Sequence, residues 1–200
     1  MISLVDVHII AGKKERWIEE CLASLSKEHV NIWFVPRIEG NTAKAREIGF
    51  RQGQADYVSF VDPDDRIVPG IFEKCLSAMD ADQSLSCVYT DEILIDEQGK
   101  YLMDGWSKST QLFPEQQLIA DIFRGVHHLQ VLRREYVEKC LPLKGKLMPE
   151  PILTSDIRQY GPLLHLPIVG YHWRIYKEQT FWCISDEELY ESRRACALMN

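Results

Sequence analysis

Apolar and polar positions follow two alternating patterns along the first third of the chain. Short apolar runs at 3–10, 30–35 and 57–61 have the length and the β-branched and aromatic content of buried strands. Between them, apolar residues recur at helical spacing over 14–26, and a second helix is expected over 42–52. The order strand, helix, strand predicts a right-handed βαβ unit on a parallel sheet.

Small side chains mark the second of these predicted helices. Thr42 is a good N-cap residue, and Gly53 is a plausible end. Ala43, Ala45 and Gly49 carry little or no side chain. The sequence therefore predicts that this helix lies close to its neighbour.

The rest of the chain continues the alternation of strands and helices. An amphipathic helix should follow Pro69-Gly70, with Ile71, Phe72, Cys75, Leu76 and Met79 facing inward. A strand at 86–90 should lead through a turn at 97–99 into a hairpin strand at 101–103. Further strands are expected at 127–132, 163–166 and 169–175. Further helices are expected at 114–124, at 136–141 and from Thr154 or Ser155 to 160. A last helix should follow a capping box at Ser185. No repeat or linker divides the sequence, so we predict one domain over residues 1–200.

The most informative stretch is 57–65, an apolar strand that ends in three carboxylates. Asp62, Asp64 and Asp65 surround Pro63, which has no N–H to donate and so stops the strand. In open α/β sheets, ligands bind at this end of the strands. Three carboxylates this close repel one another unless a cation lies between them, and oxygen ligands suit Mg²⁺ or Mn²⁺.

The acidic loop has two other possible interpretations. It could be a solvated turn, because Asp and Pro are ordinary turn residues. It could also be a calcium loop of the EF-hand type, since Glu73 is the twelfth residue counted from Asp62. The EF-hand interpretation fails, because Arg66 stands at a ligand position and Ile67 stands where the turn requires glycine.

Composition limits the class of protein. The 200 residues are 46% hydrophobic and 26% charged, which is typical of a globular domain with one core. A net charge of -7 argues against a nucleic-acid partner. The six cysteines form no C-x-x-C pair, which predicts free thiols in a reducing, cytoplasmic compartment. Residues 1–10 lack a basic leader and no run is long enough to cross a bilayer, so we expect neither a signal peptide nor a transmembrane segment.

Several motifs together resemble a known family. A small-residue helix precedes the acidic strand, Pro-Gly follows it, and an Asp-containing helix and a strand ending in Arg come later. In this order they resemble the family-two glycosyltransferases of the GT-A fold. The motifs are Ala43-Lys44-Ala45-Arg46-x-x-Gly49, Asp62-Pro63-Asp64-Asp65, Pro69-Gly70, Val88-Tyr89-Thr90-Asp91, Ile95-Asp96-Glu97-x-Gly99, Ser155-Asp156-Ile157 and Tyr171-x-x-Arg174.

The resemblance implies an α/β protein of the GT-A fold, with a Rossmann-like, mostly parallel central sheet flanked by helices and a small antiparallel element. It implies a hexosyltransferase-like enzyme that uses a nucleotide-diphosphate sugar, a UDP-sugar first and a GDP-sugar second. The acceptor would be a hydroxyl of a glycan, a lipid-linked group or a protein, and the reaction would invert the anomeric centre. Mn²⁺ or Mg²⁺ would neutralise the leaving diphosphate, and a base would take the acceptor proton.

The resemblance also assigns roles to the acidic residues. Asp62, Asp64 and Asp65 would form the nucleotide and metal site, with Asp64 toward the ribose and Asp65 toward the metal. Asp156 matches the position of the catalytic base. A structural interpretation stays open for Asp156, as a charge favoured at the start of a helix.

The remaining assigned residues belong to the nucleotide pocket. Ala11, Gly12 and Arg46 would line it, with Arg46 near the nucleobase or the phosphates, and Glu39 would replace the acid that reads uracil in the family. Arg174 would help to hold the diphosphate. Arg46 as an exposed helix residue and Arg174 as a structural ion-pair partner are the corresponding alternatives.

Departures from the family pattern keep two other functions open. Ile10-Ala11-Gly12-Lys13 replaces Pro-x-Tyr-Asn, and Glu47, Ser155 and Tyr176 stand where the family has Asn, Glu and often His. One alternative is therefore a catalytically weak or inactive module that binds a nucleotide sugar, a glycan or a protein partner. A nucleotidyltransferase ranks last, because it needs a Gly-rich basic loop after the first strand. The histidines are interpreted as core or surface groups and not as metal ligands; they are His127, His128, His165 and His172.

Overall fold

The computed structural model describes residues 4–12, 15–105 and 126–177. Its strands are β1 (Val5–Ala11), β2 (Val30–Pro36), β3 (Tyr57–Phe60), β4 (Arg66–Ile67), β5 (Cys87–Ile95), β6 (Tyr101–Asp104), β7 (Gln130–Arg133) and β8 (Leu163–Arg174). Its helices are α1 (Ile18–Leu25), α2 (Thr42–Phe50), α3 (Ile71–Ala81), α5 (Arg134–Lys139) and α6 (Glu150–Ile157). None of these helices has the length and apolar character needed to cross a bilayer.

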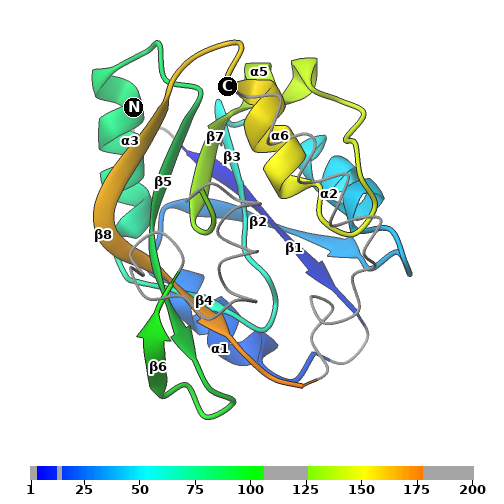
Figure 1. Cartoon of the computed structure of the whole chain (residues 1–200), viewed down its shortest axis with the longest axis vertical. Helices are drawn as coiled ribbons and strands as arrows, with labels where there is room; N and C mark the ends of the chain where they lie inside the picture. The colour runs from blue at the N-terminus through cyan, green and yellow to red at the C-terminus, as the bar shows by residue number, and fades with distance from the viewer. Residues whose placement is uncertain (1–3, 13–14, 106–125, 178–200) are drawn as a thin grey trace.

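The described strands form one eight-stranded sheet in the order β2-β1-β3-β7-β5-β8-β4, with β6 paired to β5 (Figure 1). β1 runs parallel to β2 and β3, and β5 runs parallel to β8. β7 lies antiparallel between β3 and β5, so β2, β1, β3, β5 and β8 all run in one direction. The expected mostly parallel sheet is thus confirmed, and the β5–β6 hairpin is the small antiparallel element.

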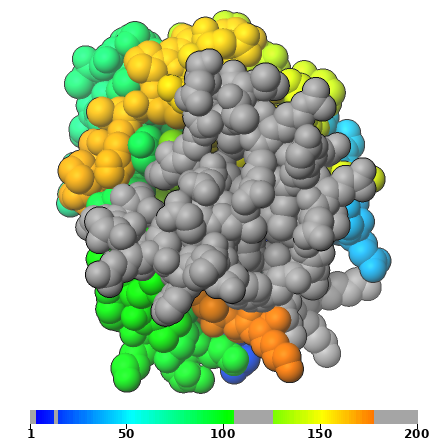
Figure 2. Space-filling model, viewed as in Figure 1, coloured from blue at the N-terminus to red at the C-terminus, as the bar shows by residue number. Residues whose placement is uncertain are grey.

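Helices cover both faces of this sheet. α1 packs against β4 on one face, and α3 packs against β5 and β7; all five α3 residues that were expected to face inward are buried there. α2, α5 and α6 pack on the other face against Val58 and Phe60 of β3. Figure 2, drawn from the same side as Figure 1, shows the β5–β6 hairpin at the lower left beside the end of β8. The described cysteines are free thiols, and Cys21 and Cys75 belong to the core as expected.

Helix α2 lies close to β1, as its small residues predict. A Cβ atom added to Gly49 would overlap the imidazole ring of His8 on β1. Cores of this density tolerate added atoms poorly. The glycine therefore sets the distance between α2 and β1, the strand that pairs with β3.

Gly49→Ala is expected to lower the free energy of unfolding by about 1–3 kcal/mol, because the new methyl group displaces either His8 or the helix. Lys44→Ala on the same helix is the control, since Lys44 is largely exposed and should change stability by no more than about 0.5 kcal/mol. Urea denaturation measures both variants. Equal stability of Gly49→Ala and the native protein would show that the close approach is not structurally important.

Several element boundaries and caps differ from the sequence expectation. Helix α6 begins at Glu150, so Thr154 lies inside it and bonds back to the Glu150 carbonyl instead of capping the helix. Asn41, and not Thr42, caps α2 by accepting from the Lys44 N–H at 2.9 Å. The two strands expected at 163–166 and 169–175 form one strand, β8, with register shifts against β5. The helix expected at 114–124 and the capping box at 185 lie outside the described residues.

Candidate active site

A cavity of about 160 Å³ lies beyond the carboxyl end of β3. The first half of the chain contributes Arg46 from α2 and the carboxylates of Asp62 and Asp64. The second half contributes Glu150 at the start of α6, together with His128 and Gln130. The cavity therefore lies where the sequence predicts a ligand, at the end of the strand that leads into the acidic loop.

Arg46 connects the two halves of the cavity. Its side chain is 3% exposed and contacts Asp62 through Nη2 at 2.5 Å and Glu150 through Nε at 2.9 Å. Its guanidinium also lies 4.1 Å from the centre of the Phe60 ring. Burial favours the neutral forms, but these contacts outweigh it: the pKa of Arg46 is raised and the pKa of Asp62 is lowered. Arg46 is therefore a buried cation of the cavity and not an exposed helix residue.

The surroundings of Asp64 shift its protonation toward neutral pH. Burial and the nearby charge of Asp62 raise the pKa of Asp64 to about 6, although a 2.8 Å hydrogen bond from the Tyr176 hydroxyl opposes this. A cation bound beside these carboxylates would favour the charged form and reverse the shift.

The raised pKa predicts the pH dependence of stability without metal. Because the folded state binds this proton more tightly than the unfolded state, the contribution of Asp64 to stability increases as the pH falls through about 6. In EDTA, the melting temperature of the native protein should therefore rise relative to that of Asp64→Asn as the pH is lowered from 7.5 to 5. A difference between the two proteins that does not change with pH would contradict the assigned environment of Asp64.

Asp65 does not face the cavity, which corrects the expectation that it faces a metal. Its side chain is 1% exposed and points into the core. Oδ2 accepts from the Tyr171 hydroxyl at 2.8 Å, and Oδ1 accepts from the Arg174 N–H at 2.7 Å. Burial, with Asp64 and Asp62 nearby, raises the pKa of Asp65 well above its usual range. Asp65 thus attaches the acidic loop to β8.

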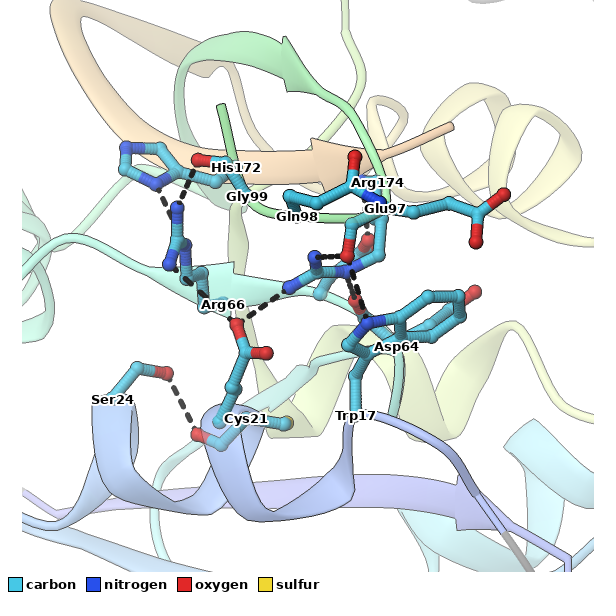
Figure 3. Close-up of polar contacts among 12 residues, drawn as sticks. Trp17, Cys21, Ser24, Asp64, Arg66, Glu97, Gln98, Gly99, His172 and Arg174 are labelled. Carbon is cyan, nitrogen blue, oxygen red and sulfur yellow. Dashed lines mark hydrogen bonds and ion pairs between the residues drawn. The ribbon is translucent and has the colours of Figure 1, made fainter. Parts of the chain in front are cut away.

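Arg174 also has a different position from the one expected for a diphosphate ligand. It is 0% exposed and is not among the described residues that line the cavity. Figure 3 shows its guanidinium between the acidic loop and the turn after β5. Nε donates to the Asp64 carbonyl at 2.7 Å, Nη1 donates to the Glu97 carbonyl at 3.0 Å, and Nη2 pairs with Glu20 at 2.8 Å. Arg174 therefore holds the backbone carbonyl of Asp64 in place.

The carboxylate that α6 places at the cavity is Glu150 and not Asp156. Asp156 pairs with Lys144 at 2.8 Å and is not among the described lining residues. Six residues of helix rotate a side chain by about 240° relative to the first, so the two acids occupy different faces of α6. Glu150 is not among the expected site residues, because the sequence favours a helix start at Thr154 or Ser155. Pro149 and Pro151, which suit a first helical turn, were the available signal.

Three of the residues expected in the nucleotide pocket do not line the cavity. Ile10, Arg37 and Ile38 line the cavity, whereas Ala11, Gly12 and Glu39 are not among the described lining residues. The Gly12 N–H donates to Glu15 at 2.6 Å, and Glu39 is exposed. The structure therefore does not bring Glu39 into the position of an acid that reads a base.

Two histidines that the sequence analysis set aside line the cavity. His127 Nδ1 lies 2.5 Å from Glu92 Oε2, and His128 stacks on Tyr171 with ring centres 4.5 Å apart. Burial holds the pKa of His128 well below its ordinary value, so its ring is neutral. His165 pairs with Asp91, and His172 accepts from Arg66, so these two are packed groups as expected.

The described residues offer part of a metal site. They include no group of three or more His, Cys, Asp or Glu side chains placed to hold an ion by themselves. Asp62 and Asp64 do present carboxylate oxygens to one cavity, and their mutual repulsion favours a cation. This donor set fits Mg²⁺ or Mn²⁺ if a bound ligand, such as a diphosphate, supplies further oxygens.

The fold is that of the GT-A class of glycosyltransferases. The family described as "Glycosyl transferase family 2" matches residues 17–141, and the chain belongs to this family. Staphylococcus aureus TarS 1–349 in complex with UDP-GlcNAc has a similar structure, with a TM-score of 0.68 and 16% identity over 98% of this chain and 66% of that one. The TarS complex with UDP gives a TM-score of 0.69, with 16% identity over 98% of this chain and 64% of that one.

Chondroitin synthase of Escherichia coli is 29% identical over 79 residues, which are 40% of this chain and 12% of that protein. This chain thus spans 66% or less of the length of each of these relatives.

Proposed function

We propose that this chain transfers a sugar from a nucleotide-diphosphate sugar to an acceptor hydroxyl. The observation that carries the proposal is the cavity beyond β3, where Asp62 and Asp64 face Glu150 across the buried cation of Arg46. Family membership supports the same activity. Sugar transfer requires a site for an anionic leaving group and a base, and this cavity offers both.

Asp62 and Asp64 would hold Mn²⁺ or Mg²⁺, which acts as a Lewis acid toward the leaving diphosphate when it is bound. Tyr176 fixes one oxygen of Asp64, and Arg174 fixes its carbonyl, so the carboxylate keeps its orientation. Asp65 is a positioning residue in this proposal. Its bonds to Tyr171 and to the backbone of Arg174 hold the loop against β8.

Glu150 is the proposed general base. It lines the cavity from α6, and its side chain is 14% exposed, so acceptor hydroxyls can reach it. Arg46 Nε holds the Glu150 carboxylate at 2.9 Å, and a carboxylate in this position can take a proton from the acceptor. One base and one displacement give inversion.

The donor and the acceptor follow from comparison and chemistry. TarS binds UDP and UDP-GlcNAc, which supports a UDP-sugar before a GDP-sugar as donor here. The acceptor is the hydroxyl of a glycan, a lipid-linked group or a protein. Cytoplasmic action and a single domain over 1–200 stay predictions.

Isothermal titration with UDP, in the presence and absence of MnCl₂, tests the proposal. UDP should bind, and Mn²⁺ should increase its affinity by at least about tenfold, because the ion joins the carboxylates to the diphosphate. Absence of binding by both UDP and GDP with Mn²⁺ would rule out the proposed donor.

A second function is a binding module without catalysis. It is favoured by the position of Arg46, which already neutralises Asp62 and Glu150. Such a module would bind UDP-sugars but release no UDP with any glycan, lipid-linked or protein acceptor. If UDP is released only when an acceptor is present, the protein is a transferase and not a binding module.

A further inference from the structure

Three polar side chains at the floor of the cavity each have an atom that no described residue satisfies. His128 Nδ1, Gln130 Oε1 and Arg46 Nη1 are buried, and none has a hydrogen-bond partner among the described residues. All three side chains line the cavity, and each is more than nine-tenths buried. Native proteins leave few buried polar atoms unpaired, so a cluster of three at one cavity indicates a missing ligand.

The chemistry of these atoms defines the group that would satisfy them. Gln130 Oε1 accepts, Arg46 Nη1 donates, and a neutral His128 ring has one donor and one acceptor. A hydroxyl group can both donate and accept. A phosphate or carboxylate oxygen only accepts and leaves Gln130 Oε1 unpaired. The floor is therefore suited to several hydroxyl groups.

The charges at the floor select against an acidic group. Arg46 is the buried cation there, and it already pairs with Asp62 and Glu150. A carboxylate brought to this place would be a third anion around one guanidinium, which is unfavourable in a buried site. A neutral hydroxyl brings no such repulsion.

The size and the apolar wall of the cavity agree with a sugar ring. Its volume of about 160 Å³ is roughly ten times what one ordered water needs. Trp173 and Met148 add apolar surface beside the polar atoms. A pyranose has both hydroxyl groups and apolar C–H faces, so it matches this combination.

We propose that His128 and Gln130 bind the hydroxyl groups of the donor's sugar, and that this sugar is neutral and not a uronic acid. The assignment rests on the proposed function, because it takes the cavity as the donor site. To the proposed function, the assignment adds the class of donor sugar and two residues that select this class.

Titration with UDP, UDP-glucose, UDP-galactose, UDP-N-acetylglucosamine and UDP-glucuronic acid, all with MnCl₂, tests the assignment. At least one neutral UDP-sugar should bind about fivefold to tenfold more tightly than UDP, and UDP-glucuronic acid should bind no more tightly than UDP. Gln130→Leu and His128→Phe should remove the neutral-sugar gain and leave the affinity for UDP within about twofold. Gln159→Leu makes the same side-chain change just after the end of α6, where Gln159 Nε2 donates to the Asp156 carbonyl, and should keep the gain.

Circular dichroism and melting temperatures establish that the variants are folded. If a variant does not fold, the comparison of neutral and acidic donors on the native protein decides. Two results would overturn the assignment: tighter binding of UDP-glucuronic acid than of the neutral UDP-sugars, or a neutral-sugar gain in affinity that survives both substitutions. In either case, binding of UDP would still support the donor site. Absence of UDP and GDP binding overturns the proposed function and this assignment with it.

Discussion

Glu150→Gln is expected to lower the turnover number by about 10²–10⁴-fold, because glutamine cannot take a proton from the acceptor. The amide keeps the shape of the side chain and an oxygen that can accept from Arg46 Nε. Affinity for UDP with Mn²⁺ should therefore stay within about threefold of the native value. Steady-state kinetics with an active acceptor, together with titration of UDP, measure the two effects separately.

Asp156→Asn is the matched control for this prediction. It changes an acid to its amide on the same helix, but Asp156 pairs with Lys144 away from the cavity. Turnover of this variant should remain within about twofold of the native value. The reverse result, with loss of turnover in Asp156→Asn and none in Glu150→Gln, would return the base to the residue that the sequence motif indicates.

Asp64→Asn is expected to lower the transfer rate by at least about 100-fold and to abolish the increase in UDP affinity caused by Mn²⁺. An amide oxygen is a weaker ligand than a carboxylate, and the ion supplies several kcal/mol of stabilisation to the leaving diphosphate. Transfer kinetics and titration of UDP across a range of MnCl₂ concentrations measure both effects.

Two other acids show whether the effect is specific to the cavity. Asp104→Asn changes an exposed carboxylate on β6 and should alter neither the rate nor the response to Mn²⁺. Asp65→Asn should lower the melting temperature first, because Asp65 joins the acidic loop to Tyr171 and Arg174. A normal response to Mn²⁺ in Asp64→Asn, with its loss in Asp65→Asn, would support the opposite assignment of these two acids.

Much of the fold could be predicted because its signals are local. The apolar run at 57–61 and the proline after Asp62 define the end of β3 without any distant contact. The inward-facing residues of α3 follow from helical periodicity. Gly49 and its small neighbours on α2 indicated a close approach to another element, and β1 is that element.

The acidic loop could be located from the sequence, but the directions of its side chains could not. Pro63 and Asp64 form a turn that is closed by a 3.1 Å hydrogen bond from the Asp65 N–H to the Asp62 carbonyl, and the sequence of this turn does not say whether Asp64 or Asp65 faces the cavity. Tyr171 and Arg174, more than 100 positions later, decide which one turns inward. A local motif does not contain this information.

Arg174 and Glu150 failed to match their expected roles for similar reasons. The guanidinium of Arg174 is fixed by the Asp64 carbonyl and by carbonyls of the turn after β5, which no spacing along the chain predicts. Glu150 depended on where α6 begins. The N-cap preference of Thr154 and Ser155 favoured a later start, whereas the two prolines and the packing of Leu153 and Ile157 set the earlier one.

Anomalous diffraction from crystals grown with UDP and Mn²⁺ tests the central claim most directly. The account predicts a manganese peak within coordination distance of the Asp62 and Asp64 carboxylates, with diphosphate oxygens as further ligands and Asp65 still turned toward Tyr171. A cavity that holds UDP without a manganese peak, or a peak bound by other side chains, would contradict it.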